Sequence, residues 1–390
     1  MKAIRGLRRR LGRELGKAQL ALLVRRYCHG KQRRADSQPR LGIGPAIFAS
    51  GQARAWADAV ATYEDRCDTE SFGPRRGTVL DFDSDRTFTV GQWFSRPWQI
   101  AENVPYVLTQ YTHLLLESGR SVFGQLRGKY FDSDLPYLGE CGISVGVVLH
   151  GSDVRDPDHH AATEPLSPFR GGAESADPSW SVRVDTLRRE SARLRERLDA
   201  SPSIPKFVST PGLLDYVSDA EWLPVVVAAA KRQHVHRQSD GPPIILHIPT
   251  NPTMKGTRFI DPICRKLEQA GLIRYTSPGL LTPGDFSSLL EQASIVIDAV
   301  SQADGPTVTA CQAMAAGAVV VAHIPDTVRA RIPVELPIVE ASANTLEAVI
   351  AGLVLDTERR NQIAEAGRKY VEQFHSGRYA AEILLRFIEA

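Results

Sequence analysis

Three short stretches of the sequence combine polar side chains with glycine in patterns that could bind or transform a ligand. They are HGSDVR at 150–155, HIPTNPTMKGT at 247–257 and DGPTVTACQAMAAG at 304–317. Each lies at or shortly after a run of apolar, mostly β-branched residues, which predicts a buried strand. Because ligands of open parallel sheets sit beyond the carboxyl ends of the strands, the three stretches are candidates for one site.

The third stretch opens a predicted helix over 307–316, which Gly317 ends. The N-terminus of this helix offers free backbone N–H groups and the positive end of the helix dipole, both of which suit a phosphate. Buried strands are predicted before it, at 295–300, and after it, at 319–322. The loop 301–307 is therefore the first place where we expect a ligand.

The HGSDVR stretch has two interpretations. In one, His150, Asp153 and Arg155 act on a substrate, because loops just past buried strands are where α/β enzymes keep their chemistry. In the other, Asp153 and Arg155 pair with each other and His150 is a satisfied strand-end residue. The residues leave both interpretations open. His159 and His160 follow closely, but they lack a third ligand at fixed spacing, so we predict no metal site there.

The composition is that of a soluble globular protein, with 43% apolar and 24% charged residues. The sequence contains no run of 18 apolar residues and no signal-peptide pattern, so we expect neither a transmembrane helix nor secretion. The cysteines are scattered and odd in number, which predicts a reduced, cytoplasmic protein without structural zinc. They are Cys28, Cys67, Cys141, Cys264 and Cys311.

The alternation of predicted strands and helices indicates an α/β protein with two doubly wound parallel sheets. We place the domain boundaries in polar segments rich in proline and glycine. The predicted parts are an N-terminal arm at 1–40, a first domain at 41–235, a second domain at 236–375 and a C-terminal helix at 376–390 that could cross back to the first domain. Residues 64–105 show no clear pattern, and residues 156–177 predict no regular structure.

The arm carries the basic character of the chain. Residues 1–40 hold 13 lysines and arginines against 2 acidic residues, whereas the rest of the chain holds 34 against 43. Apolar residues recur at steps of three and four, which predicts a basic amphipathic helix within 1–34. They are Ile4, Leu7, Leu11, Leu15, Ala18 and Leu22.

The helix could bind one of three kinds of partner. The pattern favours an anionic membrane surface, which would place the protein peripherally on the inner face of a membrane. The second candidate is the body of the protein or a partner helix. The third is nucleic acid, which we do not expect, because no aromatic residue is interleaved with the basic ones before Tyr27.

Two of the polar stretches resemble a known family. The 247–257 stretch, with its Lys255, looks like the phosphate-binding loop of GT-B glycosyltransferases of the retaining, family-4-like kind. The 304–317 stretch resembles the glycine loop of that family, where the second of two glutamates precedes Ala-Met-Ala-x-Gly. HGSDVR resembles the first-domain loop that faces the acceptor and the donor sugar. The resemblance covers about 106–390, is weaker over 41–105 and is absent from the arm.

The resemblance implies two Rossmann-like domains that face a cleft. It also implies an enzyme that transfers a sugar, with retention, from a nucleoside-diphosphate sugar to a hydroxyl acceptor. No metal and no cofactor is implied, because Lys255 and the N–H groups of 307–309 would stabilise the departing diphosphate. If the arm binds a membrane, the acceptor would be lipid-linked or a growing polysaccharide.

The resemblance is carried over residue by residue. The implied catalytic residues are His150, Asp153, Lys255 and Asp304. The implied donor-binding residues are Gly151, Arg155, Thr250, Asn251, Lys255, Gly256, Asp304, Gly305, Thr307, Val308, Thr309 and Gln312. The implied acceptor-side residues are Gly51, Gln52, Glu117 and Arg120. Asp304 would approach the hydroxyls of the donor sugar, and Gln312 would approach the ribose.

The sequence departs from the family pattern at three places. Asp304 replaces the first glutamate with a side chain one methylene shorter, and Gln312 replaces the second with a neutral amide. Pro249 and Thr250 stand where the family has an arginine before the lysine. These departures motivate two alternatives, which are a non-catalytic GT-B-like partner or scaffold protein and a sugar-nucleotide epimerase.

Overall fold

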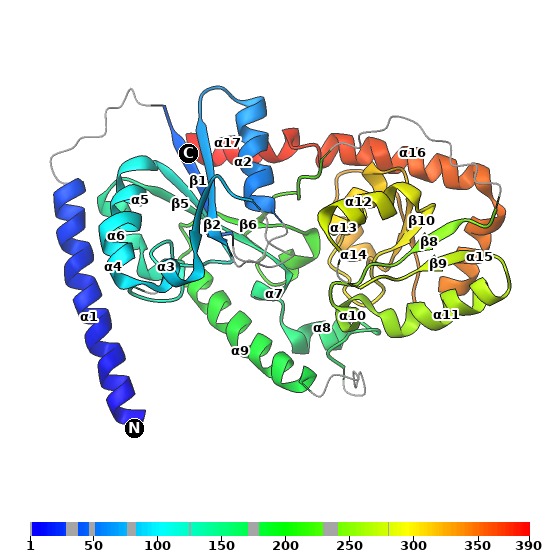
Figure 1. Cartoon of the computed structure of the whole chain (residues 1–390), viewed down its shortest axis with the longest axis horizontal. Helices are drawn as coiled ribbons and strands as arrows, with labels where there is room; N and C mark the ends of the chain where they lie inside the picture. The colour runs from blue at the N-terminus through cyan, green and yellow to red at the C-terminus, as the bar shows by residue number, and fades with distance from the viewer. Residues whose placement is uncertain are drawn as a thin grey trace.

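Two parallel β-sheets, each covered by helices, make up the body of the protein (Figure 1). The computed structural model describes residues 2–28, 38–46, 51–75, 83–124, 126–170, 179–228, 241–279 and 281–390, with the backbone alone for 2–13. The predicted α/β class with doubly wound parallel sheets is confirmed.

The first sheet has the strand order β3-β2-β1-β4-β5-β6-β7, and all its pairs are parallel. The strands are β1 Arg40–Gly44, β2 Asp68–Arg75, β3 Arg86–Thr89, β4 His113–Glu117, β5 Ser144–Leu149, β6 Lys206–Val208 and β7 Glu221–Trp222. The strand order reverses between β1 and β4. Such a switch point opens a crevice beyond the carboxyl ends of the strands.

The second sheet has the order β12-β11-β10-β8-β9 and is also parallel throughout. Its strands are β8 Ile244–Leu246, β9 Arg274–Thr276, β10 Ile295–Ile297, β11 Val319–Ala322 and β12 Ile338–Glu340. The three residues of β10 and the four of β11 are all buried. Burial on both faces explains why these strands read as continuous apolar runs.

Helices cover both faces of each sheet. Around the first sheet lie α1 Lys2–Tyr27, α2 Gln52–Tyr63, α3 Val90–Phe94, α4 Arg96–Trp98, α5 Val104–Gln110, α6 Leu135–Glu140, α7 Gly151–Val154, α8 Pro157–Thr163 and α9 Trp180–Asp199. The second sheet is flanked by α10 Pro252–Lys255, α11 Thr257–Gln269, α12 Pro283–Gln292, α13 Val308–Ala315, α14 Asp326–Arg329, α15 Leu346–Leu355 and α16 Thr357–Phe374.

The last helix, α17 Arg378–Glu389, leaves the second sheet and packs beside α2 (Figure 1). Its Leu384 and Phe387 join the buried cluster that contains Trp56 of α2. The close approach of the chain to α2 requires a glycine at position 377. Gly377 has a left-handed φ of 106°, and a Cβ there would lie 2.9 Å from the Cβ of Ala59.

Two segments expected to be irregular contain regular elements. Residues 64–105 include β2 and β3, which tertiary packing of Phe72 and Phe88 holds although β2 contains glycine and proline. Within 156–177, α8 forms because the Asp156 side chain accepts hydrogen bonds from the N–H groups of Asp158 and His159. In both places, packing or a capping contact outweighed weak local propensity.

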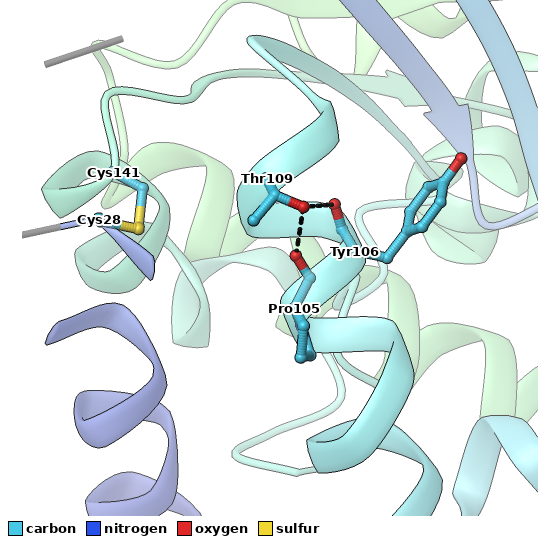
Figure 2. Close-up of a disulfide and its surroundings, with 5 residues drawn as sticks. All are labelled: Cys28, Pro105, Tyr106, Thr109 and Cys141. Atoms are coloured by element: carbon cyan, nitrogen blue, oxygen red, sulfur yellow. Dashed lines mark hydrogen bonds between the residues drawn. A yellow bond between two sulfur atoms is a disulfide. The ribbon is translucent and has the colours of Figure 1, made fainter. Parts of the chain in front are cut away.

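The arm is docked on the first domain and held by a disulfide between Cys28 and Cys141 (Figure 2). The expectation that all cysteines are reduced is therefore wrong for this pair. The cause is tertiary, since α1 contacts α5 and α6 and brings the two Cα atoms to 5.1 Å across 113 residues of sequence. The free cysteines Cys67, Cys264 and Cys311 are buried. The expected cytoplasmic location loses the support that it drew from reduced cysteines.

The docked face of α1 differs from the apolar stripe that the sequence marks. Gly16, Leu20 and Val24 are buried against the domain, whereas Leu15 and Leu22 are 56% and 63% exposed. No helix within the described part of the chain is long and apolar enough to span a membrane. Over residues 14–27, whose side chains the structure describes, α1 therefore has a buried face and, apart from it, the exposed Leu15 and Leu22. The side chains of Ile4, Leu7 and Leu11, which belong to the predicted stripe, lie outside the described ones.

Candidate functional site

The ends of three neighbouring strands of the first sheet bring Glu117, His150 and Ser209 together. Glu117 is the last residue of β4, and His150 and Ser209 directly follow β5 and β6, so His150 lies in the middle. Its Nδ1 is 3.1 Å from the Ser209 Oγ, and its Nε2 is 3.6 Å from Glu117 Oε1. The ring stacks on Trp56 of α2, with the centroids 6.0 Å apart and the planes inclined by 10°. These contacts fix the imidazole at the carboxyl edge of the sheet.

The surroundings of Glu117 and His150 favour protonation of the pair. Burial raises the pKa of the Glu117 carboxyl, although His150 opposes the shift. Burial acts to lower the pKa of His150, but the nearby carboxylates of Glu117 and Asp153 outweigh it, so the pKa of His150 is raised. The residue after Glu117, Ser118, has a left-handed φ of 55°. Such strain in a non-glycine residue is a common feature of functional strand ends.

The HGSDVR stretch spans the whole of α7 with its two flanking residues, and its polar residues have separate partners. The backbone N–H of His150 donates to Asp153 Oδ2 at 2.8 Å. One of the two interpretations of this stretch paired Arg155 with Asp153. The structure does not show this pair. The Arg155 guanidinium instead contacts Asp304 of the second domain. Asp153 thus shapes the turn, and Arg155 connects the two domains.

The contact between Arg155 and Asp304 is buried on both sides, with side chains 3% and 5% exposed. Gln302 Nε2 donates to Asp304 Oδ2 at 3.0 Å, and the Gly212 N–H donates to the Asp304 carbonyl at 2.8 Å. Ala303 has a left-handed φ of 59° beside this carboxylate. The loop before α13 is therefore held in a strained conformation against the first domain.

Lys255 meets a carboxylate that our sequence analysis did not single out. Its Nζ is 2.5 Å from Asp298 Oδ1, and the Lys255 and Asp298 side chains are 8% and 3% exposed. Thr307 Oγ1 donates to Asp298 Oδ2 at 2.8 Å and accepts the N–H of Ala310 at 3.2 Å. Asp298 comes directly after β10, a position that the strand-end rule marks, but the apolar Ala299 and Val300 beyond it made the strand look longer. This network joins the lysine to the N-terminus of α13.

The remaining donor-loop residues surround that network. Asn251 caps α10 by accepting the Met254 N–H at 3.2 Å, and Thr250 beside it is exposed. Gly256 has a φ of 78°, and a Cβ there would lie 2.4 Å from the Ser301 Oγ. The loop before α13 contains Gly305, and α13 itself contains Val308, Thr309 and Gln312. In the first turn of a helix, the N–H groups have no acceptor within the helix, so those of Val308 and Thr309 can face an anion.

The four predicted acceptor-side residues are not equivalent. Glu117 lies beside His150, and the backbone N–H of Arg120 donates to the Glu117 carbonyl at 3.0 Å. Gly51 starts α2 with a left-handed φ of 75°. Gln52 is buried and bonds both backbone groups of Val226, at 3.2 and 2.7 Å. Gln52 therefore ties α2 to the chain after β7. Among the four, Glu117 contacts His150, a predicted catalytic residue. Ser209 and Trp56 also contact His150 and are therefore added to the candidate site.

Further ion pairs join the two domains near this site. His323, after β11, contacts Glu164 of the first domain at 3.2 Å and Glu340 of the second at 2.6 Å. Arg331 contacts Asp215 of the first domain at 2.5 Å. The two carboxylates raise the pKa of His323 to about 9. The domains are thus in contact through charged side chains at several points.

Comparison with known proteins extends these observations. No protein-family model matches the chain, and no curated protein matches it in sequence. The fold is similar to sucrose-phosphate synthase from Thermosynechococcus elongatus, with a TM-score of 0.58, 14% identity, and coverage of 90% of this chain and 98% of that one. It is also similar to a glycosyltransferase from Rickettsia africae, with a TM-score of 0.55, 14% identity, and coverage of 91% and 98%.

A third similar structure is HepE from Anabaena, which was solved in complex with UDP-glucose. Its TM-score is 0.53 at 13% identity, and the match covers 90% of this chain and 100% of that one. At such identities the likeness establishes the fold alone, which is that of the GT-B glycosyltransferases. The order and parallel pairing of the two sheets agree with this fold.

Proposed function

From the GT-B fold and its strand-end residues, we propose that the protein transfers a sugar from a nucleoside-diphosphate sugar to a hydroxyl acceptor. The observation that carries the proposal is the Lys255, Asp298 and Thr307 network at the N-terminus of α13. It places a cation beside helix N–H groups, and across the domain contact lies a first-domain cluster around His150. A cation and N–H donors suit a departing diphosphate, and the opposite cluster suits sugar hydroxyls.

Each part of the site has a role in this proposal. Lys255 and the N–H groups of Val308 and Thr309 stabilise the negative charge that grows on the leaving diphosphate. Gln312, one turn into α13, binds the ribose. Asp304 binds hydroxyls of the donor sugar. His150 contacts the transferred sugar or the acceptor, with Glu117 and Ser209 holding its ring.

Retention of configuration and independence from metal ions are also proposed. Among the described residues, no group of three or more His, Cys, Asp and Glu side chains is arranged to hold a metal ion. We expect turnover to survive exhaustive treatment with a chelator and added excess EDTA. Proton NMR of the first-formed product gives its anomeric configuration. A product of opposite configuration to the donor would refute retention, and loss of turnover that Mg²⁺ or Mn²⁺ restores would refute metal independence.

The proposal is tested with a panel of nucleotide sugars and a matched pair of lysine variants. Wild-type protein should bind or hydrolyse at least one donor, and Lys255→Met should lose at least tenfold in donor affinity, the size of a lost charge-assisted hydrogen bond. Lys266→Met is the control, because Lys266 pairs with Glu347 on an exposed surface. Unchanged donor binding in Lys255→Met would remove its phosphate role. No binding of any donor by the wild type would favour a non-catalytic scaffold.

We further propose that α1 binds an anionic membrane surface. The specific observation is that Leu15 and Leu22 stay exposed on one face while Gly16, Leu20 and Val24 dock on the domain. The helix also carries most of the arm's arginines. An apolar stripe flanked by cations is the pattern of a helix that lies in a lipid interface. A membrane location would suit a lipid-linked or polysaccharide acceptor.

Liposome co-sedimentation tests the membrane proposal. Full-length protein should pellet with vesicles that contain phosphatidylglycerol and much less with neutral phosphatidylcholine vesicles. Replacing Leu15 and Leu22 together with glutamine should reduce pelleting. Leu355→Gln is the control, because Leu355 is 84% exposed at the end of α15. Equal pelleting with neutral and anionic vesicles would refute the proposal.

A further inference from the structure

Gln19 shows which side of the first domain the exposed leucines of α1 border. Residues three and four apart are neighbours on a helix surface, so Gln19 lies on one face of α1 between Leu15 and Leu22. The Gln19 Oε1 accepts a hydrogen bond at 2.9 Å from the Nε of Arg96, the first residue of α4. Leu15 and Leu22 therefore lie on the side of α1 that borders the segment of α3 and α4.

The short helix α3 exposes apolar side chains in that segment. Its first residue, Val90, is 39% exposed, and its last residue, Phe94, is 56% exposed. The two are four residues apart and so share one face of the helix. Trp93 occupies the buried face, where its ring stacks on Phe88 with the centroids 5.0 Å apart. The packing of Trp93 thus keeps Phe94 on the outer side of α3.

The docking of α1 fixes its position relative to α3. Leu20 and Val24 are fully buried and belong to the same hydrophobic core cluster as Trp93. The disulfide between Cys28 and Cys141 adds a covalent link at the end of α1 (Figure 2). The exposed apolar residues of the two helices are therefore parts of one folded unit.

We infer that α1 and α3 form a single lipid-binding face, in which Phe94 inserts into an anionic bilayer together with Leu15 and Leu22. The inference rests on the proposed membrane role of α1 and adds a second contact from the body of the first domain. Two contacts fix how the domain is oriented on the bilayer, whereas a helix alone can turn about its own axis.

Charge and aromatic composition favour a lipid surface as the occupant of this face. Residues 1–40 hold 13 lysines and arginines against 2 acidic residues, and the side chains of Arg25 and Arg26 are exposed on α1. These cations complement anionic headgroups. Trp98, four residues after Phe94, is only partly buried, and tryptophan is enriched at the level of the headgroups.

Quenching of tryptophan fluorescence by brominated lipid tests the position of α3. Full-length protein is bound to vesicles of phosphatidylglycerol and phosphatidylcholine, with and without bromine on the phosphatidylcholine acyl chains. Of the five tryptophans, Trp98 and Trp180 are only partly buried, and Trp180 begins α9. Bromine should quench the wild type. Trp98→Phe should remove most of the intensity lost to bromine, whereas the control Trp180→Phe should leave that loss unchanged.

Titration with the vesicles without bromine measures the contribution of Phe94. Phe94→Gln should weaken binding about fivefold, because the side chain no longer transfers apolar area into lipid. Val182→Gln is the control, since Val182 is 65% exposed on α9, and it should bind like the wild type. Static light scattering without lipid shows whether the face pairs two copies of the chain instead.

Unchanged affinity in Phe94→Gln, or quenching that does not depend on Trp98, would overturn the inference while wild-type binding to vesicles leaves the role of α1 intact. A wild-type dimer that Phe94→Gln converts to a monomer would also overturn it, because a second copy would then occupy the face. A wild type that binds no vesicle would overturn the membrane role of α1 as well. If Phe94→Gln does not fold, the quenching of Trp98 still decides.

Discussion

Two buried ion pairs of the same chemistry occupy two different settings in this molecule. Lys255 and Asp298 both belong to the second domain, and Thr307 holds the second carboxylate oxygen. Arg155 and Asp304 come from different domains. The first pair therefore exists whenever the second domain is folded, whereas the second pair exists only while the domains meet. Two pairs of equal burial thus differ in setting, because one lies within a single domain and the other joins two domains.

The largest effect is expected from breaking the pair within the domain. Lys255→Met leaves the Asp298 carboxylate buried without its cation, which costs about 3–5 kcal/mol of stability. Adding Asp298→Asn should restore much of that loss. All five tryptophans lie before residue 223, and Trp222 stacks on Phe374 at the end of α16, so their fluorescence does not report selectively on the second sheet. Hydrogen exchange of β10 and β11 should be measured instead, and equal protection in the wild type and Lys255→Met would contradict this prediction.

Breaking the pair between the domains should cost less. In Arg155→Met, the Asp304 carboxylate can regain water when the domains separate, so we expect a loss of about 1–3 kcal/mol. Hydrogen exchange of peptides from the first sheet and from the loop 301–307 measures this loss of stability. If Arg155→Met and Lys255→Met are equally destabilising, the distinction between the two settings is wrong.

A pH titration sharpens the comparison at a third interdomain contact. Glu164 and Glu340 raise the pKa of His323 to about 9 from an ordinary value of 6.5. Because the docked-state pKa is the higher one, the contribution is fully present below about pH 6.5 and is lost as the pH rises through about 9. We expect an effect on the order of 1 kcal/mol, since the site is partly exposed.

Small-angle scattering at pH 6 and pH 10 checks this contribution. The radius of gyration of the wild type should increase at pH 10, because the domains lose a charged contact. The radius of gyration of His323→Gln should be nearly the same at pH 6 and at pH 10. Identical curves for the wild type at both values would show that His323 does not help to hold the domains together.

The smallest effect is expected at Arg331 and Asp215. Their side chains are 28% and 38% exposed, so the pair contributes no more than about 1 kcal/mol. Arg331→Gln should leave the exchange of both sheets close to that of the wild type, although the bond to the Pro211 carbonyl at 3.0 Å is also lost. A loss as large as that of Arg155→Met would mean that burial does not decide the strength of these contacts.

Much of the scaffold could be predicted from local sequence. The apolar runs that became β10 and β11 and the helix that Thr307 caps lie close to their predicted places. β2 could not be predicted, because its glycine and proline disfavour a strand, and pairing with β1 and β3 together with packing of Phe72 holds it. Local patterns thus identify elements whose own residues favour them, and they miss elements that the rest of the fold imposes.

The candidate site was predicted as a set of loops, without its internal contacts. Lys255, Asp304 and His150 were singled out from polar stretches that follow predicted strands. The structure places His150 directly after β5, Lys255 at the end of α10, and Asp304 in the loop between β10 and α13. Asp298 and Ser209 were missed, although both follow buried strands. Asp298 was missed because the apolar Ala299 and Val300 extend the predicted strand beyond it, to residue 300.

The sequence by itself determined two parallel sheets with polar loops at their strand ends, because strand and helix patterns are properties of short segments. The tertiary structure alone decided which groups meet. Lys255 and Asp298 are 43 residues apart, Cys28 and Cys141 are 113 apart, and Arg155 and Asp304 are 149 apart. It also decided which stripe of α1 is buried. Contacts at such separations depend on how whole elements pack, and no local spacing records them.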